Sequence, residues 1–414
     1  MAMISRINYI CVIFTLFASL CNARNLHLHS QMKNFVTIQD NLFSINGRAF
    51  LFNGFNSYWM MVVGADPSQR YKISTVFGEA AAVGLTVCRT WAFNDGGDHA
   101  LQISPGVYDE QVFQSLDFVI YQARKLGIRL ILSLVNNWDD YGGRKQYVKW
   151  AQDAGVQVNN TDDFFTNSEL KGYYKNHVQK VLTRINNFTG VAYKDDPTIM
   201  AWELMNEPRC ESEFTGNIVH AWVQEMAAYL KSLDSEHLLE IGLEGFYGAS
   251  EPDRTKYNPD GLLYGTDFIK SNLIEEIDFT TIHAYPGVWL SNQSDEAQIA
   301  FFKEWMTSHW VDSRRTLKKP LVLAEFGKSE KDKGYDVKIR YGFMNFAYSS
   351  NYKFAKAGKA IGGALVWQIL SDEMENYNDG YAIVLSEDAS TSAIIEKQSV
   401  RMRDLAVLFD RLTQ

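Results

Sequence analysis

Cysteine is scarce in this chain of 414 residues, which contains only four. Two of them, Cys11 and Cys21, lie within the first 23 residues, so the rest of the chain holds only Cys88 and Cys210. A fold built on a disulfide framework is therefore excluded. One bond between these two residues remains open, although Cys88 lies in an expected strand beside Arg89 and should face the outer helices as a buried thiol.

An excess of positive charge and long apolar runs are also missing. Lys and Arg total 40 against 49 for Asp and Glu, without a basic block, which excludes the electrostatic footprint of a nucleic-acid-binding protein and favours a neutral partner. The main apolar run, residues 9–20, is shorter than the roughly 20 residues of a membrane span. Because Arg6 precedes this run and Ala23 offers a cleavage site, we expect residues 1–23 to be a secretion signal and the protein to have no membrane anchor.

Paired metal ligands and linkers are absent as well. The eight histidines include no H-x-x-x-H pair on a helix, and no cysteine pair accompanies them, so we predict neither a catalytic metal nor a cofactor. No linker rich in Pro, Gly and Ser divides the chain, and we expect residues 24–414 to form one domain. Three N-glycosylation sequons, at Asn159, Asn187 and Asn292, agree with secretion, and their occupancy stays open.

Eight short apolar runs are present, and longer helical patterns separate them. Several runs are almost continuously apolar, as expected for parallel strands that are covered on both faces. Eight such repeats predict an α/β fold with a single (β/α)8 TIM barrel. The main alternative, an open doubly wound sheet, commonly has a phosphate-binding G-x-G-x-x-G after its first strand, and this chain has none there. The predicted strands are residues 51–55, 86–91, 129–136, 199–203, 238–243, 279–283, 321–325 and 363–368.

Local patterns add three further elements. Residues 35–50 alternate apolar and polar side chains around Gln39-Asp40-Asn41, which predicts a short N-terminal β-hairpin that plugs the bottom of the barrel. Residues 112–126 have helical spacing and end at Gly127. Ser168 followed by Glu169 predicts the N-cap of a helix that runs to Ile185.

Polar and aromatic residues collect at the carboxyl ends of the predicted strands, where a barrel of this kind has its functional site. Two of them are carboxylates, Glu207 after the fourth strand and Glu325 on the seventh. A buried carboxylate without a partner is costly, so two at one mouth indicate a function. In chain order the residues are Asn56, Trp59, Arg89, Trp91, Asn136, Trp138, Asn206, Glu207, Glu244, His283, Tyr285, Glu325 and Trp367.

Two carboxylates on opposite walls are what glycoside hydrolysis requires. One protonates the departing sugar oxygen and the other attacks the anomeric carbon to form a covalent intermediate, which needs carboxyl groups about 5 to 5.5 Å apart. We expect the charge of Glu325 to raise the pKa of Glu207, and donors such as Arg89 and Tyr285 to keep Glu325 ionised.

Five segments together resemble glycoside hydrolase family 5, in the clan with glutamates on strands four and seven. They are Asn206-Glu207-Pro208, Ala324-Glu325-Phe326-Gly327, Arg89-Thr90-Trp91, His283-Ala284-Tyr285 and Trp367-Gln368. The resemblance covers essentially all of residues 24–414. The longer stretches at residues 90–95 and 283–289 are similar to the plant endo-β-mannanases rather than to the bacterial cellulases.

The resemblance implies a role for each of these site residues. Glu207 matches the acid/base and Glu325 the nucleophile, while Asn206 matches the residue that binds the 2-hydroxyl of the sugar. Arg89 matches the group that positions and charge-balances the nucleophile, and Tyr285 matches its hydroxyl donor. His283 matches a neighbour of the acid/base, Trp367 the platform beneath the sugar, and Trp91 a polar indole at the same subsite. The Trp367-Gln368 peptide is also expected to be cis.

The resemblance implies hydrolysis of internal β-1,4-mannosidic linkages of mannan, glucomannan and galactomannan with retention. We expect the protein to be a monomer that is secreted to the cell wall. The substrate partner is then a β-mannan polysaccharide or a manno-oligosaccharide. A β-1,4-glucanase, a mannan transglycosylase and an inactive sugar-binding protein remain alternatives. Structural roles also stay open for an Arg89–Glu203 ion pair, for His283 as a core histidine, and for Trp59, Trp138 and Trp289 as loop packing.

Overall fold

The computed structural model of the chain describes residues 34–413, so the expected signal at residues 1–23 lies outside the described residues. One parallel sheet of eight strands dominates the fold, in the order β10-β9-β8-β5-β4-β13-β12-β11. Its strands are β4 (Phe52–Asn56), β5 (Val87–Trp91), β8 (Arg129–Ser133), β9 (Ile199–Glu203), β10 (Leu238–Glu240), β11 (Thr280–Ala284), β12 (Leu321–Phe326) and β13 (Ile361–Val366).

The sheet closes on itself between β10 and β11. Backbone N–H groups of Asp278 and His283 donate to the carbonyls of Leu239 and Glu244, each at 2.8 Å, and so join the two ends of the strand order. The predicted (β/α)8 barrel is confirmed, and each predicted apolar run overlaps one strand, although β13 begins two residues before its run. The ladders of β8 and β10 end three residues before the apolar runs do, because residues such as Leu134 and Leu243 stay buried after the ladder has ended.

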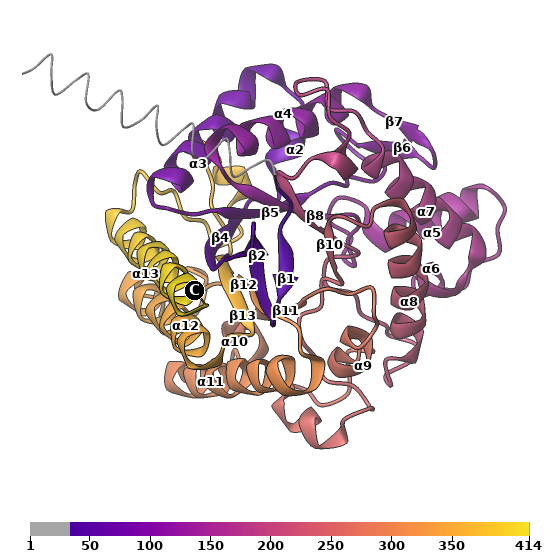
Figure 1. Cartoon of the computed structure of the whole chain (residues 1–414). Coiled ribbons are helices and arrows are strands. Elements are labelled where there is room, and N and C mark those ends of the chain that lie inside the picture. Colours follow the sequence, from indigo (N-terminus) through magenta and orange to yellow (C-terminus); the bar gives the residue numbers. More distant parts are fainter. Residues whose placement is uncertain (1–33, 414) are drawn as a thin grey trace, which may run out of the picture.

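Helices surround the barrel on all sides (Figure 1). They are α2 (Met60–Val63), α3 (Arg70–Ala82), α4 (Glu110–Leu126), α5 (Gly143–Asp153), α6 (Asp163–Thr166), α7 (Ser168–Leu182), α8 (Asn217–Leu233), α9 (Phe268–Asn272), α10 (Pro286–Trp289), α11 (Asp295–Asp312), α12 (Val337–Gly358) and α13 (Ala389–Thr413). A separate pair of short strands, β6 (Gln102–Ser104) and β7 (Val107–Tyr108), lies between β5 and α4 in the chain. None of the described helices combines the length and the apolar character that a membrane crossing needs.

Two helix ends test the expected capping signals. The helix expected over 112–126 is α4, and it ends at Gly127 in a left-handed conformation with φ 72°. The cap expected at Ser168 is wrong by one residue. Asn167 is the N-cap of α7, because its extended backbone lets its side-chain oxygen accept from the backbone N–H of Glu169 at 2.9 Å. The helix ends at Leu182 rather than at Ile185.

The N-terminal hairpin covers the bottom of the barrel, as predicted. Strands β1 (Thr37–Gln39) and β2 (Leu42–Ile45) cross the centre of the barrel in Figure 1. The fully buried Phe43 reaches the barrel interior, where its ring lies 5.2 Å from that of Phe279 and 5.6 Å from that of Phe52. The unit has a third strand that the sequence did not indicate, β3 (Arg48–Ala49), because the chain turns at Asn46 and Gly47 and pairs with β2 again.

Apolar side chains pack in two layers, one inside the barrel and one between the barrel and its helices. Cys88 belongs to the outer layer, as its position in β5 predicted. Cys88 and Cys210 are both buried free thiols, so the structure contains no bond between them.

Candidate active site

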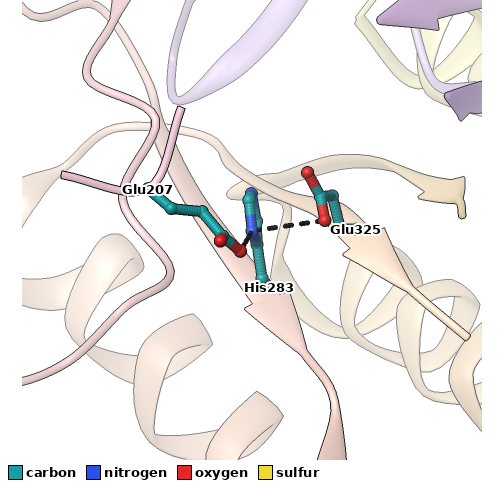
Figure 2. A group of neighbouring side chains, drawn as sticks. All are labelled: Glu207, His283 and Glu325. Carbon is teal, nitrogen blue, oxygen red and sulfur yellow. Dashed lines mark hydrogen bonds and ion pairs between the residues drawn. The ribbon is translucent and has the colours of Figure 1, made fainter. Parts of the chain in front are cut away.

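Glu207 and Glu325 meet at the mouth of the barrel, with His283 between them (Figure 2). The Nδ1 atom of His283 lies 2.5 Å from Oε1 of Glu207 and 3.6 Å from Oε2 of Glu325. This nitrogen and one oxygen of each carboxylate all lie within 4.8 Å of one another. Folding therefore brings together two acidic side chains that are far apart in the chain.

The backbone at Glu207 has an unusual conformation that directs its side chain into the mouth. Its φ of 52° lies in the left-handed region, which a residue with a Cβ rarely adopts. The N–H of Glu207 donates to the carbonyl of Gly242 at 2.9 Å. Gly242 itself has φ 93°, and a Cβ there would lie 1.8 Å from the carbonyl oxygen of Met205. Only glycine at position 242 allows this close approach of the two chain segments.

Arg89 is fully buried and connects the site to the barrel interior. Its Nη1 donates to Oε1 of Glu325 at 2.5 Å, and its Nη2 donates to Oδ1 of Asn206 at 2.6 Å. Its Nε and Nη2 also donate to the two carboxylate oxygens of Glu203, at 2.5 and 2.7 Å. Burial opposes the charge of Arg89, but Glu203 and Glu325 outweigh burial and raise its pKa. The Arg89–Glu203 ion pair is thus present, and the same guanidinium also binds Glu325.

Each oxygen of Glu325 accepts a hydrogen bond, one from the fully buried Arg89 and one from the partly buried Tyr285. Arg89 binds Oε1, and the hydroxyl of Tyr285 donates to Oε2 at 2.6 Å. Burial raises the pKa of Glu325, and the neighbouring His283, Arg89 and Tyr285 act in the opposite direction. Arg89 and Tyr285 thus act in the expected direction, but burial outweighs all these neighbours and the pKa of Glu325 is raised overall.

Glu207 has a different environment from the one expected. Its Oε1 binds His283, and its Oε2 accepts from the indole Nε1 of Trp138 at 2.6 Å. Burial raises the pKa of Glu207, but the His283 hydrogen bond and charge outweigh it, and the pKa is lowered overall. The expectation of a raised pKa is therefore wrong for this site. The physical reason is His283, whose own pKa is raised by Glu325 and Glu207 against the effect of burial.

The two carboxylates lie in a cleft with a volume of about 660 Å³. Three polar stretches of the chain, within residues 139–167, 243–264 and 285–298, each contribute lining residues. The lining residues are Tyr58, Trp91, Asn136, Trp138, Asp140, Tyr141, Asn206, Glu207, Arg209, Glu244, Asp260, Tyr264, Tyr285, Val288, Trp289, Glu325, Trp367 and Asp379.

An aromatic group lies on the β4 and β13 side of the carboxylate pair. The ring of Trp367 stacks on that of Tyr58 at 5.5 Å with an angle of 9°, and its indole Nε1 donates to Oδ2 of Asp379 at 2.6 Å. Trp91 lies 6.2 Å from Trp367 and is almost fully buried. The Trp367-Gln368 peptide is cis, as predicted. Tyr58 and Asp379 carry no sequence motif that could have identified them.

A charged group lies on the opposite side, near β10 and β11. Arg209 donates to both oxygens of Glu244 at 2.7 Å, and its guanidinium lies over the rings of Trp138 and Tyr264 at 4.9 and 5.0 Å. Burial and then the charge of Glu207 raise the pKa of Glu244 to about 7. Sequence reasoning missed Arg209, although its position directly after Asn206-Glu207-Pro208 could have indicated it.

The three tryptophans with open roles divide between packing and the cleft. Trp59 is fully buried and donates to the carbonyl of Ile369, so it packs a loop. Trp138 and Trp289 line the cleft, and Trp138 binds Glu207 directly. Asn56 is also fully buried, and it accepts from Arg89 at 3.1 Å beneath the site.

Glu207, His283 and Glu325 are close enough together to act as ligands of a metal ion. The guanidinium of Arg89, 2.5 Å from Glu325, opposes a second positive charge at this position. The donor set therefore suits a hydrogen-bonded acid pair better than a cation.

Comparisons with known proteins agree with this geometry. A family model described as glycoside hydrolase family 5, β-mannosidase-like, matches residues 33–371. Mannan endo-1,4-beta-mannosidase 5 from Solanum lycopersicum is 59% identical over 405 residues, which are 96% of this chain and 98% of that protein. Mannan endo-1,4-beta-mannosidase 1 from Oryza sativa subsp. japonica is 53% identical over 382 residues, which are 92% of this chain and 88% of that protein.

Solved structures show the same fold. The endo-β-1,4-mannanase from Thermotoga petrophila superposes with a TM-score of 0.75 at 33% identity, over 86% of this chain and 78% of that chain. The endo-1,4-β-mannanase from Rhizomucor miehei gives a TM-score of 0.74 at 29% identity, over 89% and 99% of the two chains. The region that the family model matches contains all eight barrel strands and Glu207, His283 and Glu325, and the chain belongs to glycoside hydrolase family 5, in its β-mannosidase-like group.

Proposed function

We propose that the protein hydrolyses internal β-1,4-mannosidic linkages with retention at the anomeric carbon, with Glu207 as acid/base and Glu325 as nucleophile. This proposal rests on the geometry of the two carboxylates: one oxygen of Glu207 lies within 4.8 Å of one oxygen of Glu325 at the mouth of the cleft. Retaining enzymes need carboxyl groups about 5 to 5.5 Å apart, whereas inverting enzymes keep about 6.5 to 9.5 Å to admit a water molecule.

The surroundings of Glu325 suit a nucleophile. Arg89 and Tyr285 donate to its two oxygens and hold the carboxylate in one orientation. Since both donors already contact Glu325 before substrate binds, they stabilise the ionised group without reorganisation. In the first step Glu325 attacks the anomeric carbon, and the bond to the leaving sugar breaks.

The surroundings of Glu207 suit a proton donor and acceptor. The hydrogen bond between His283 Nδ1 and Glu207 Oε1, at 2.5 Å, holds a proton next to the carboxylate. Glu207 delivers a proton to the leaving oxygen in the first step and takes one from the attacking water in the second. We propose that His283 supports this exchange by holding the proton while the site is empty.

The cleft gives the substrate binding sites on both sides of the scissile bond. Trp367 offers a flat ring for the apolar face of a pyranose, and Asn206 lies within the cleft beside Glu207 to bind a hydroxyl. Arg209 and Trp289 line the opposite side. Subsites on both sides favour internal cleavage, and the names of the relatives point to mannan. Glucomannan and galactomannan, which contain the same linkage, are proposed as further substrates.

Azide rescue distinguishes the two carboxylate roles. With an activated aryl mannobioside, Glu325→Gly plus azide should yield the α-mannobiosyl azide, because azide attacks directly in place of the nucleophile. Glu207→Ala plus azide should yield the β-azide, because azide intercepts the covalent intermediate. The same anomer from both variants, or the reverse assignment, would contradict the proposal. The parent enzyme treated identically is the control.

Product analysis on defined oligosaccharides tests the substrate. The proposal expects mannohexaose to be cut at internal bonds and cellohexaose to be left largely intact. Preferential cleavage of cellohexaose would indicate a β-1,4-glucanase, and products longer than the substrate would indicate a transglycosylase. Tight binding of mannohexaose without turnover would indicate a sugar-binding protein.

We further propose that the protein is secreted to the cell wall and acts as a monomer. The three sequon residues Asn159, Asn187 and Asn292 are all exposed, so each could carry a glycan. N-terminal sequencing of protein from the medium of a plant cell culture should begin at Arg24, after cleavage behind Ala23. Retention of the protein inside the cells would contradict this part of the proposal.

A further inference from the structure

A second pair of carboxyl groups lies beneath the site, inside the barrel. Glu203 ends β9, and Glu240 ends the neighbouring strand β10. The two residues are in register in the parallel ladder, and both are fully buried. Since neighbouring strands lie about 4.8 Å apart and residues in register face the same side, the two side chains stand next to each other.

The hydrogen bonds of these two carboxyls are unequal. Both oxygens of Glu203 accept from the guanidinium of Arg89. Oε2 of Glu240 accepts from the backbone N–H of Gly242 at 2.5 Å and from the hydroxyl of Thr281 at 3.1 Å. Oε1 of Glu240 is buried and has no donor among the described residues. An ionised Glu240 would leave a negative oxygen unpaired beside the charge of Glu203, which is costly in a buried place.

The groups around Glu240 do not supply a counter-charge of its own. The positive group is Arg89 on β5, and Glu203 on β9 and Glu325 on β12 already share it. Strand β11 contributes the neutral hydroxyl of Thr281, and His283, two residues further along, faces Glu207 and Glu325. Burial, followed by the charge of Glu203, raises the pKa of Glu240 well above its usual range.

We propose that Glu240 is a positioning residue. Its carboxyl group is protonated on Oε1 and donates a hydrogen bond to Glu203, and this bond lets Arg89 contact both Glu203 and Glu325. A hydrogen bond from Glu240 stabilises part of the negative charge of Glu203, so Glu203 attracts the guanidinium of Arg89 less strongly. The guanidinium keeps its bond to Glu325, and the nucleophile stays ionised. This role rests on the proposed function of Glu325, whereas the presence of the proton does not.

Infrared difference spectroscopy tests the proton directly. The spectrum of Glu240→Gln minus that of the parent, recorded at pH 8, should show the loss of a carbonyl band of a protonated carboxyl group. Glu225→Gln is the matched control, because Glu225 lies at the surface and pairs with Lys171 and Lys175. Its difference spectrum should lose only a carboxylate band. A carboxylate loss in Glu240→Gln overturns the proposal.

The pH dependence of kcat/KM on mannohexaose tests the positioning role. Glu240→Gln keeps a neutral hydrogen-bond donor toward Glu203, so the acidic limb of the kcat/KM profile should stay at the same pH as in the parent. Glu240→Leu is also neutral but has no donor, so Glu203 should draw Arg89 away from Glu325 and move the acidic limb upward by about one pH unit, a tenfold loss on the acidic side.

Three results would overturn the positioning role. A downward shift of the limb in Glu240→Gln means that the parent residue is ionised. A loss of activity in Glu240→Leu at every pH without a shift means a structural role alone, and equal shifts in both variants mean that the hydrogen bond is irrelevant. If azide rescue fails at Glu325 while the infrared band is lost, the proposed function falls and the proton on Glu240 stands.

Discussion

Removal of one hydroxyl group, in Tyr285→Phe, gives the sharpest test of the proposed nucleophile. The hydroxyl donates to Oε2 of Glu325 at 2.6 Å, and the ring centroid lies 5.3 Å from that of Tyr381. Phenylalanine keeps the ring and removes only the donor. A hydrogen bond to a charged group contributes roughly 1.5 to 3 kcal/mol, so kcat/KM should fall about 10- to 150-fold.

The same variant should move the pH profile in a defined direction. Glu325 must be ionised to attack, and the Tyr285 hydrogen bond lowers its pKa. Without this bond the pKa rises, so the carboxylate is lost at a higher pH and the acidic limb moves upward by roughly one to two units. The assay is kcat/KM on mannohexaose across the pH range, with Tyr381→Phe as the matched control. A Tyr285→Phe enzyme within threefold of the parent and with an unmoved limb would refute the reasoning.

Three further perturbations follow from the same contacts. In His283→Leu, Glu207 and Glu325 both lose a group that lowers their pKa, so both limbs of the kcat/KM profile should move to higher pH; a fixed basic limb would contradict the Glu207 assignment. Gly242→Ala should lower the free energy of unfolding by roughly 2 kcal/mol or more in urea titration, because its Cβ would meet the Met205 carbonyl. Gly78→Ala is the control, since that helical position is open and should gain stability. Dialysis against EDTA should leave kcat unchanged, because Arg89 opposes a cation at the carboxylate pair; loss of activity that Ca²⁺, Mg²⁺ or Zn²⁺ restores would count against this view.

The sequence by itself determined the barrel and the identity of its main polar residues. Strands such as β9 and β12 are apolar runs with one glutamate each, and a nearly continuous apolar run is what a parallel strand buried on both faces requires. The residues at the ends of these runs, Glu207 and Glu325 among them, had to face one mouth because parallel strands in a barrel all end on the same side.

Only the tertiary structure decided which side chains touch. The sequence left two roles open for Arg89, an ion pair with Glu203 and a contact with Glu325. Arg89 makes both contacts. Trp59 and Trp138 look equivalent in sequence, yet one packs beneath a loop and the other binds Glu207. The lowered pKa of Glu207 depends on a 2.5 Å contact with His283, which lies on another strand. Periodicity reports which face of a strand is buried, but distances between strands arise only when the barrel closes, and the chemistry of the site depends on those distances.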